Sequence, residues 1–358
     1  MILTKYTKND MKDINNIGLI MFGLLGDVLI RTPVLRALKN IYPHVKITVI
    51  VDPIGVALLS HNDYVDDIIV VHKNNKNKIK SNFAKLQGIL KVYSRHFDLL
   101  INLYNGGSSH LLAKLSGAKY KLAFCNQKKT TYNVLNECNG DRLKEAQSLY
   151  SYMISIVEPL SSKEYSLKPV FHPSKETDAK MQNFLKDLNV NSNQPYLLNL
   201  GASKEDKLLE MEKYITIVEY IYQNHGFIPA IILNPTQEYL QNDFIEKYMK
   251  PRELPFIRLE LLSLEEIASL MTLTKFIITP DTGLMHLAMA MDVYIFAIFT
   301  YTHPVFVDIH SNKFVPLYEN FDKDIFYQHQ DISENSIKQG VTTLFDKINM
   351  NNHRIVST

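Results

Sequence analysis

Short apolar runs alternate with helically spaced apolar residues along the first half of the chain. Ile17–Phe22 and Val45–Val51 have the β-branched character of buried strands, and apolar residues recur at helical spacing over Val28–Ile41. Pro33 is expected only in the first turns of that helix, because proline lacks the N–H that an interior position donates. Three more strands are predicted at Val65–Val71, Phe97–Leu103 and Lys119–Phe124. The alternation favours a parallel sheet covered on both faces.

A second series of the same kind follows a region rich in proline. We place the linker at Lys168–Asn193, with a helix at Lys175–Leu188 inside it, and the series resumes with a strand in Tyr196–Gly201. The elements predicted next are Met211–Asn224, Phe227–Leu233, Glu238–Met249, Phe256–Leu259, Leu264–Leu273, Phe276–Thr279 and Tyr294–Phe299. Ser333–Met350 has the pattern of a terminal helix.

The predicted organisation is therefore two Rossmann-like domains. They comprise residues 1–170 and 171–330, and residues 331–358 carry a C-terminal helix expected to pack back on the first domain. In open α/β sheets, ligands bind beyond the carboxyl ends of the strands. Three turns suited to a ligand follow such ends, namely Gly23–Asp27, Gly201–Lys207 and Pro280–His286. We expect the two sheets to face each other across one cleft that these turns line.

Composition excludes several classes of protein. Hydrophobic residues make up 46% and charged residues 21%, as in an ordinary soluble protein, and a net charge of +2 gives no sign of nucleic-acid binding. Cys125 and Cys138 lack the spacing of a metal site or a disulfide framework, which favours a reducing compartment. No apolar run has the roughly 20 residues that span a bilayer, and the polar N-terminus lacks a secretion signal. We expect a cytoplasmic protein, with peripheral contact at the inner membrane surface left open.

The stretch Thr279–Ala288, TPDTGLMHLA, carries the most chemistry. It follows an apolar run and precedes helically spaced residues, so a strand, a tight turn and a helix are predicted. Asp281 or Thr282 would cap the helix, Gly283 would allow close backbone approach, and the helix N-terminus suits a phosphate group. His286, one turn on, would point towards the same anion. The alternative is an ordinary strand–helix junction with His286 on the surface.

Several stretches resemble glycosyltransferase family 9, the heptosyltransferases. They are Gly26–Val28, Thr32–Leu38, Tyr42–Pro43, Asn199–Ser203, Lys207, and Asp281–Ala288 with Ala290. The resemblance implies the GT-B architecture of two Rossmann-like domains. It also implies transfer of a sugar with inversion and without a metal ion or other cofactor, from a nucleotide diphosphate donor, typically ADP-heptose, to a growing lipopolysaccharide core.

The resemblance assigns roles to individual residues. Asp27 fills the position of the catalytic base, and Lys207 would meet the charge that develops on the departing diphosphate. The donor would also contact seven other residues: Ser203, Glu238, Asp281, Thr282, Gly283, Leu284 and His286. On the acceptor side, Gly26 belongs to the turn, and Arg31 would orient Asp27 or meet an acceptor anion; a solvated arginine is the alternative.

Two positions depart from the family pattern. The sequence around Glu238 lacks the usual glycines, and Leu209 stands where many members carry tryptophan, which puts the donor sugar in doubt. Asp322–Asp324 matches a metal-binding pattern of another glycosyltransferase architecture but follows no predicted strand, so we interpret it as surface. A nucleotide-sugar epimerase or hydrolase of the same fold, and a non-catalytic nucleotide-sugar-binding protein, remain as alternative functions.

Overall fold

The structure is a computed structural model of all 358 residues. It describes residues 6, 8–71, 78–124, 131–136, 148–188, 195–321 and 327–356, without the side chains of 78–85, 135 and 351–356. Cys125, Cys138, Asp322–Asp324 and the end of the expected linker lie outside the described residues. The chain divides into two compact units, Met1–Phe171 and His172–Thr358.

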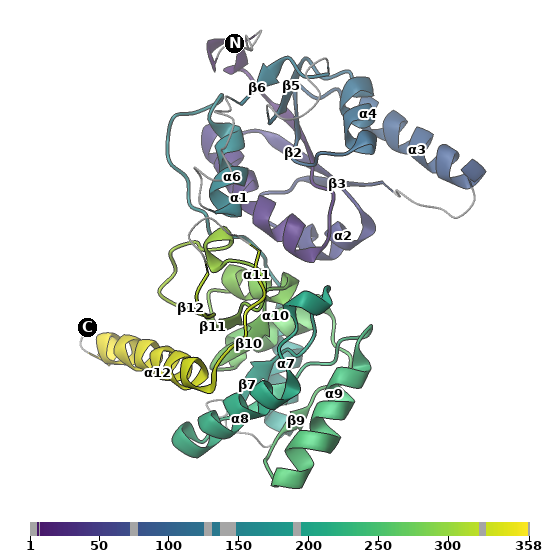
Figure 1. The fold of residues 1–358 in the computed structure, drawn as a ribbon. Helices are drawn as coiled ribbons and strands as arrows, with labels where there is room; N and C mark the ends of the chain where they lie inside the picture. The colour runs from purple at the N-terminus through teal and green to yellow at the C-terminus, as the bar shows by residue number, and fades with distance from the viewer. Residues whose placement is uncertain are drawn as a thin grey trace. The chain divides into compact units, whose positions relative to one another are not determined.

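Unit 1 is a parallel sheet with helices packed on it (Figure 1). Its strands run in the order β3-β2-β1-β4-β5-β6, so the chain reverses direction across the sheet between β1 and β4. The strands are β1 (Asn16–Ile20), β2 (Lys46–Val51), β3 (Asp67–Val70), β4 (Leu99–Asn102), β5 (Tyr120–Ala123) and β6 (Val134–Leu135). The helices are η1 (Lys8–Met11), α1 (Leu25–Ile41), α2 (Pro53–Leu59), α3 (Lys78–Tyr93), α4 (Gly107–Leu115), α6 (Leu149–Ile154) and η2 (Ser155–Val157).

Unit 2 repeats this architecture with the strand order β12-β11-β10-β7-β8-β9. The strands are β7 (Pro195–Leu198), β8 (Ile228–Ile231), β9 (Ile257–Arg258), β10 (Phe276–Pro280), β11 (Tyr294–Ile298) and β12 (Phe314–Leu317). The longer helices are α7 (Lys175–Asp187), α8 (Met211–His225), α9 (Glu238–Phe244), α10 (Leu264–Leu273), α11 (Gly283–Ala290) and α12 (Glu334–Val356). The shorter ones are η3 (Glu205–Lys207), the π-helical η4 (Ile245–Met249), η5 (Lys250–Arg252) and η6 (Pro304–Phe306).

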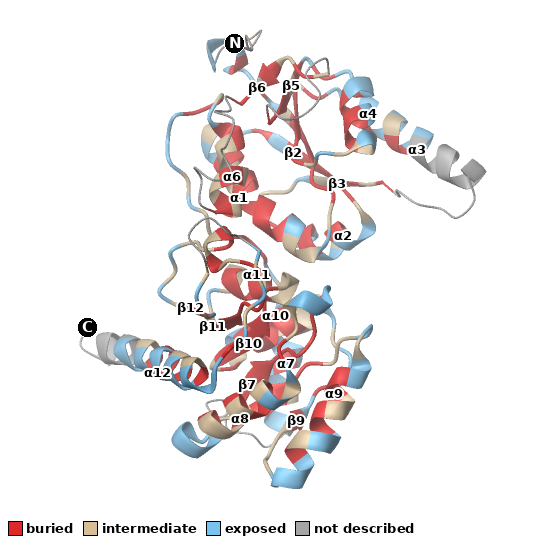
Figure 2. Cartoon of the chain, viewed as in Figure 1, coloured by how far each residue is buried: buried red, intermediate tan, exposed pale blue. Residues whose placement is uncertain are grey.

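Burial follows the layers, with central strands buried and outer helix faces exposed (Figure 2). Strands β4, β7 and β10 are buried at every position, as expected of parallel strands covered on both faces. No helix among the described residues is long and apolar enough to cross a bilayer.

Pro33 lies in the middle of α1 rather than in its first turns, so the expectation for this residue was wrong. The missing N–H leaves the carbonyl of Leu29 without its usual helical partner. The Thr32 hydroxyl donates to that carbonyl at 2.7 Å and accepts the N–H of Val170 at 2.8 Å. One side chain therefore compensates for the proline and ties the end of unit 1 to α1.

The C-terminal helix α12 packs within unit 2. It contacts α8, β11 and β12, and its Phe345 ring stacks on the imidazole of His225 at 3.5 Å. Gly340 lies so close to Phe296 that a Cβ there would approach the ring to 2.8 Å. Because Ile337, Val341 and Leu344 are fully buried in the same cluster, α12 is part of the unit 2 core.

His303 caps η6 in unit 2. Its Nδ1 accepts the N–H of Val305 at 3.1 Å, which requires the unprotonated nitrogen. Burial lowers the pKa of the His303 imidazole below its ordinary value. The folded unit therefore favours the neutral ring.

Lowering the pH should destabilise unit 2 through His303. The pKa of His303 is lower in the folded chain than in the unfolded chain, where it is about 6.5, so the free energy of unfolding is fully retained above that pH. As the pH falls below that value, the unfolded chain binds the proton more readily, and the free energy of unfolding decreases. His303→Asn keeps an acceptor at the cap and removes the titration, so urea unfolding should show a smaller loss between neutral and acidic pH than in the wild type. Equal losses in the two proteins would refute this assignment.

Candidate functional site

Asn199 organises the carboxyl ends of β7 and β10. Its Nδ2 donates to the Gly201 carbonyl at 3.1 Å and to the Thr279 hydroxyl at 3.0 Å, and its Oδ1 accepts the Gly201 N–H at 3.1 Å. A longer contact of 3.4 Å reaches the Thr282 hydroxyl. Asn199 thus joins two turns that are about eighty residues apart in the chain, and the sequence had assigned it no role.

Lys207 lies over the same strand ends and forms an ion pair with Asp281. Nζ of Lys207 is 2.5 Å from Oδ2 of Asp281 and 3.3 Å from its carbonyl oxygen. Asp281 is 6% exposed as a whole residue, whereas 22% of the Lys207 side-chain surface is exposed to solvent. The Thr300 hydroxyl donates to the Asp206 carbonyl at 2.8 Å and anchors η3 from the β11 side. The ammonium is therefore held in place and still reaches solvent.

The predicted strand–turn–helix is confirmed at β10 and α11. Thr282 is the N-cap, although its side chain makes no capping bond, and Gly283 and Leu284 form the first turn with partial exposure. The first N–H groups of a helix lack intrahelical partners and carry its positive dipole end. His286 is only 5% exposed, so it is not the surface residue of the alternative interpretation. Lys207, Asp281 and this helix N-terminus occupy one locality in unit 2.

Two of the predicted donor residues are exposed. Ser203 lies on the turn after β7, and Glu238 is the first residue of α9, beyond the end of β8. A Cβ on Gly201 would lie 2.7 Å from the side-chain ends of Asn234 and Gln237 in the turn after β8, so the two turns pack closely here. Asn234 and Gln237, which the sequence did not single out, close this edge with a 3.0 Å hydrogen bond.

A cavity of about 520 Å³ lies beside η3, within unit 2. Its lining includes Leu208, Leu209, Lys213, Thr300 and Gln330. Leu209, the departure from the family pattern, thus shapes space beside η3. Among the described residues no group of three His, Cys, Asp or Glu side chains is placed to hold a metal ion.

In unit 1 the turn between β1 and α1 presents Asp27. Leu24 is the N-cap, and Oδ2 of Asp27, at the third helical position, accepts the Leu24 N–H at 3.0 Å. Gly23 has φ of +145°, and a Cβ there would come within 2.5 Å of Asp27. The side chain of Asp52 accepts the Gly23 N–H at 3.1 Å. Asp27 is exposed, and Gly26 before it is half-buried.

Arg31 is buried below this turn, so the alternative of a solvated arginine is wrong. It is 7% exposed, and its Nη1 donates to the Phe22 carbonyl at 2.5 Å. Burial lowers the pKa of the guanidinium, while the charge of Asp27 opposes that shift. Arg31 therefore braces the turn that carries Asp27 and supplies a positive charge beside it.

A buried polar network follows β4 in unit 1, and no sequence pattern indicated it. Nδ2 of Asn102 donates to the Tyr132 hydroxyl at 2.6 Å, and that hydroxyl is 2.8 Å from Nδ1 of His110. Nε2 of His110 is 3.1 Å from Oδ1 of Asn105. Burial raises the pKa of Tyr132 to about 12, so the phenol remains protonated. The network fixes the turn beyond the carboxyl end of β4.

A family model described as glycosyltransferase family 9 (heptosyltransferase) matches residues 89–335. The chain belongs to this family. The matched stretch contains Lys207 and Asp281–His286, whereas Asp27 and Arg31 precede it.

Two curated relatives are lipopolysaccharide heptosyltransferase 3 proteins. The one from Escherichia coli is 31% identical over 99 residues, which are 27% of this chain and 29% of that protein. The one from Escherichia coli strain K12 is 22% identical over 223 residues, or 60% of this chain and 61% of that protein. The matches thus cover less than two thirds of the length of either relative.

Solved structures of the family share the fold. A family 9 glycosyltransferase from Veillonella parvula DSM 2008 superposes with a TM-score of 0.77 at 19% identity, over 93% of this chain and 98% of that one. E. coli ADP-heptose lps heptosyltransferase II gives 0.74 at 16% identity, over 94% and 99%. These likenesses confirm the predicted α/β fold of GT-B type.

Replacing Asn199 with alanine should cost unit 2 about 2–3 kcal/mol of unfolding free energy, because the Gly201 N–H and Thr279 hydroxyl lose a buried partner. Urea unfolding measures the change. Asn224→Ala is the matched control, since it removes a solvent-exposed bond from Nδ2 of Asn224 to the Tyr220 carbonyl and should stay within about 0.5 kcal/mol of the wild type. Similar losses in both variants would contradict the role of Asn199.

Proposed function

We propose that this protein is an inverting glycosyltransferase that moves a sugar, a heptose in the first instance, from an ADP-linked donor to a lipopolysaccharide core or related surface glycan. The observation that carries the proposal is the Lys207 ammonium, held by Asp281 beside the N-terminus of α11 at the strand ends of a family 9 fold. A diphosphate is the anion that a cation and helix amides together suit best.

The donor half of the reaction rests on charge. As the glycosidic bond breaks, its electron pair moves to the diphosphate oxygen, and the nucleoside diphosphate leaves with an added negative charge. The Lys207 ammonium and the amides of Gly283 and Leu284 would receive that charge, and such preorganised donors stabilise a transition state without moving. Their positive charge would do this work without a metal ion, as the family resemblance implies.

The acceptor half needs one base. The attacking hydroxyl forms the new bond to the anomeric carbon and gives its proton to a carboxylate, for which we assign Asp27. Its Oδ2 accepts the Leu24 N–H, while its Oδ1 accepts no bond from a described residue. Arg31 keeps the turn in shape through the Phe22 carbonyl and is a positioning residue.

The names of similar proteins support the substrates. The curated relatives are lipopolysaccharide heptosyltransferases, and one similar structure is an ADP-heptose heptosyltransferase. The exposed Glu238, at the start of α9, is assigned to the donor ribose, and Ser203 to the donor phosphate.

Asp27→Asn should lower kcat by at least about 100-fold, because a positioned general base contributes about 10² to 10⁴. Transfer from ADP-heptose to extracted core acceptor is measured with and without EDTA, and the wild type should be unaffected by EDTA. Asp13→Asn, a change at an exposed carboxylate of the same unit, is the control and should keep full activity. Near-normal activity of Asp27→Asn would refute the base, and loss with EDTA would refute the metal-free scheme. Donor turnover without acceptor would instead indicate a hydrolase or epimerase.

Nucleotide binding tests the donor side separately. ADP should raise the melting temperature of the wild type more than UDP or GDP does, because a ligand that binds the folded state stabilises it by mass action. Lys207→Met should abolish most of that rise. Lys163→Met, which removes an exposed lysine of unit 1, should leave it unchanged. Equal shifts for the three nucleotides would reject ADP as the preferred donor nucleotide.

A further inference from the structure

Helices α3 and α4 of unit 1 carry exposed apolar side chains on their outer faces. These side chains are Leu86, Leu90 and Tyr93 on α3, and Leu111 and Leu115 on α4, with 42% to 57% of each exposed. The spacings of four and three residues place each set on one side of its helix. We call these five residues the α3–α4 face.

The inner faces of the same helices make the usual core contacts. In α3, Gly88 and Val92 face the sheet, and a Cβ on Gly88 would reach the Val71 side chain at 3.4 Å. In α4, Leu112 and Ala113 are buried in the same cluster. The outward apolar residues are therefore additional to the core, and burial within unit 1 does not account for them.

The Tyr93 side chain connects the exposed faces of α3 and α4. Its ring lies against Gly117, just past the end of α4, where a Cβ would meet it at 3.0 Å. Helices α3 and α4 also contact each other directly. Leu115, two residues before Gly117, thus lies near the C-terminal end of the α3 stripe, and the five side chains form a single strip.

The sequence that carries the strip is strongly basic. Between residues 86 and 124 the basic residues are Lys91, Arg95, Lys114, Lys119 and Lys121, and the one acidic residue is Asp98. Arg95 forms an ion pair with Asp67. Asp98 is engaged by the N–H groups of Asn15 and Asn16. Lys91 and Lys114 are exposed, and neither forms an ion pair within the described part of the chain. By sequence alone, residues 68–136 hold eleven lysines and one arginine against that single aspartate, although the whole chain has a net charge of only +2.

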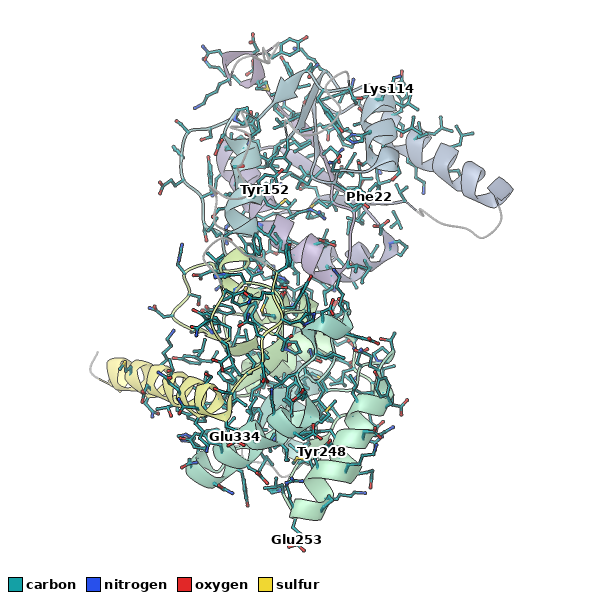
Figure 3. All side chains as sticks on the ribbon, viewed as in Figure 1. Phe22, Lys114, Tyr152, Tyr248, Glu253 and Glu334 are labelled. Carbon is teal, nitrogen blue, oxygen red and sulfur yellow. The ribbon has the colours of Figure 1, made fainter. Side chains whose placement is uncertain are left out.

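From this combination we propose that the α3–α4 face docks on the surface of an anionic lipid bilayer. Leucines and a tyrosine would enter the boundary between headgroups and acyl chains, while the flanking lysines contact lipid phosphates. Lys114, labelled in Figure 3, is an exposed residue of α4 next to Leu115, and its alkyl stem can lie along the apolar strip with the ammonium at the headgroups. A protein partner would not require so one-sided a charge, and a nucleic acid would not favour five exposed apolar side chains. The inference does not depend on the proposed reaction.

Flotation of the full-length protein with lipid vesicles tests the proposal. Vesicles of phosphatidylcholine with phosphatidylglycerol should bind the wild type at least tenfold more strongly than phosphatidylcholine alone, and high salt should weaken that binding. Lys91→Glu with Lys114→Glu should reduce binding at least tenfold, since each basic residue near such a surface contributes about 1 kcal/mol, or about fivefold. Leu90→Glu with Leu115→Glu should abolish binding even at low salt.

Matched controls separate docking from folding and catalysis. Leu261→Glu introduces the same charge at an exposed leucine of unit 2, and Lys163→Glu does so at an exposed lysine of unit 1; both should bind vesicles as the wild type does. All variants should keep the wild-type melting temperature. The proposal would be overturned if the wild type does not bind vesicles or binds neutral vesicles equally well. It would also be overturned if the α3–α4 variants bind as the wild type does. The proposal would also be overturned if the wild type dimerises without binding vesicles and Leu90→Glu with Leu115→Glu removes the dimer. That result would assign the α3–α4 face to a second copy of the chain.

Discussion

The ion pair between Lys207 and Asp281 is the interaction on which the unit 2 site depends. Asp281 is almost fully buried, and a buried carboxylate is costly unless a cation and hydrogen bonds compensate it. Lys207 supplies that charge from a short turn, which the Thr300 hydroxyl holds down at the Asp206 carbonyl. The position of the ammonium is therefore set by a structural requirement of the folded unit, before any ligand is bound.

Both units use the same device to present a charged group at a strand end. In unit 1 the chain leaves β1, passes Gly23 in the left-handed region and enters α1 with Asp27 in its first turn. In unit 2 the chain passes from β7 through Gly201 and from β10 through Thr282. Glycine is required at position 23, because φ is +145° and a Cβ would come within 2.5 Å of the Asp27 Cβ. Parallel strands make this possible, since they place successive turns at one edge of the sheet.

Much of this arrangement could be predicted from periodicity, and the exceptions have local causes. The run Leu264–Leu273 was located to the residue, and in the structure Ser263 and Glu266 form a capping box at its start. Strands β6 and β12 were missed, since Val134–Leu135 is too short for a pattern and Pro316 lies inside Phe314–Leu317. The amphipathic pattern of α12 indicated a buried face, but it could not show that the unit 2 core buries that face.

The site shows the same division between local and long-range information. Motifs located Lys207, Asp281 and Thr282, because each follows a strand at short range. The role of Asn199 depends on a partner eighty residues away, so it has no local signal. The net charge of the chain fails to predict the basic surface of unit 1 for a related reason. A value of +2 sums over the whole chain, whereas the potential at a surface depends on charges within about one Debye length, roughly 10 Å. A chain that is nearly neutral in total can therefore present a strongly basic face, and only the arrangement of α3 and α4 shows where its apolar residues join that charge.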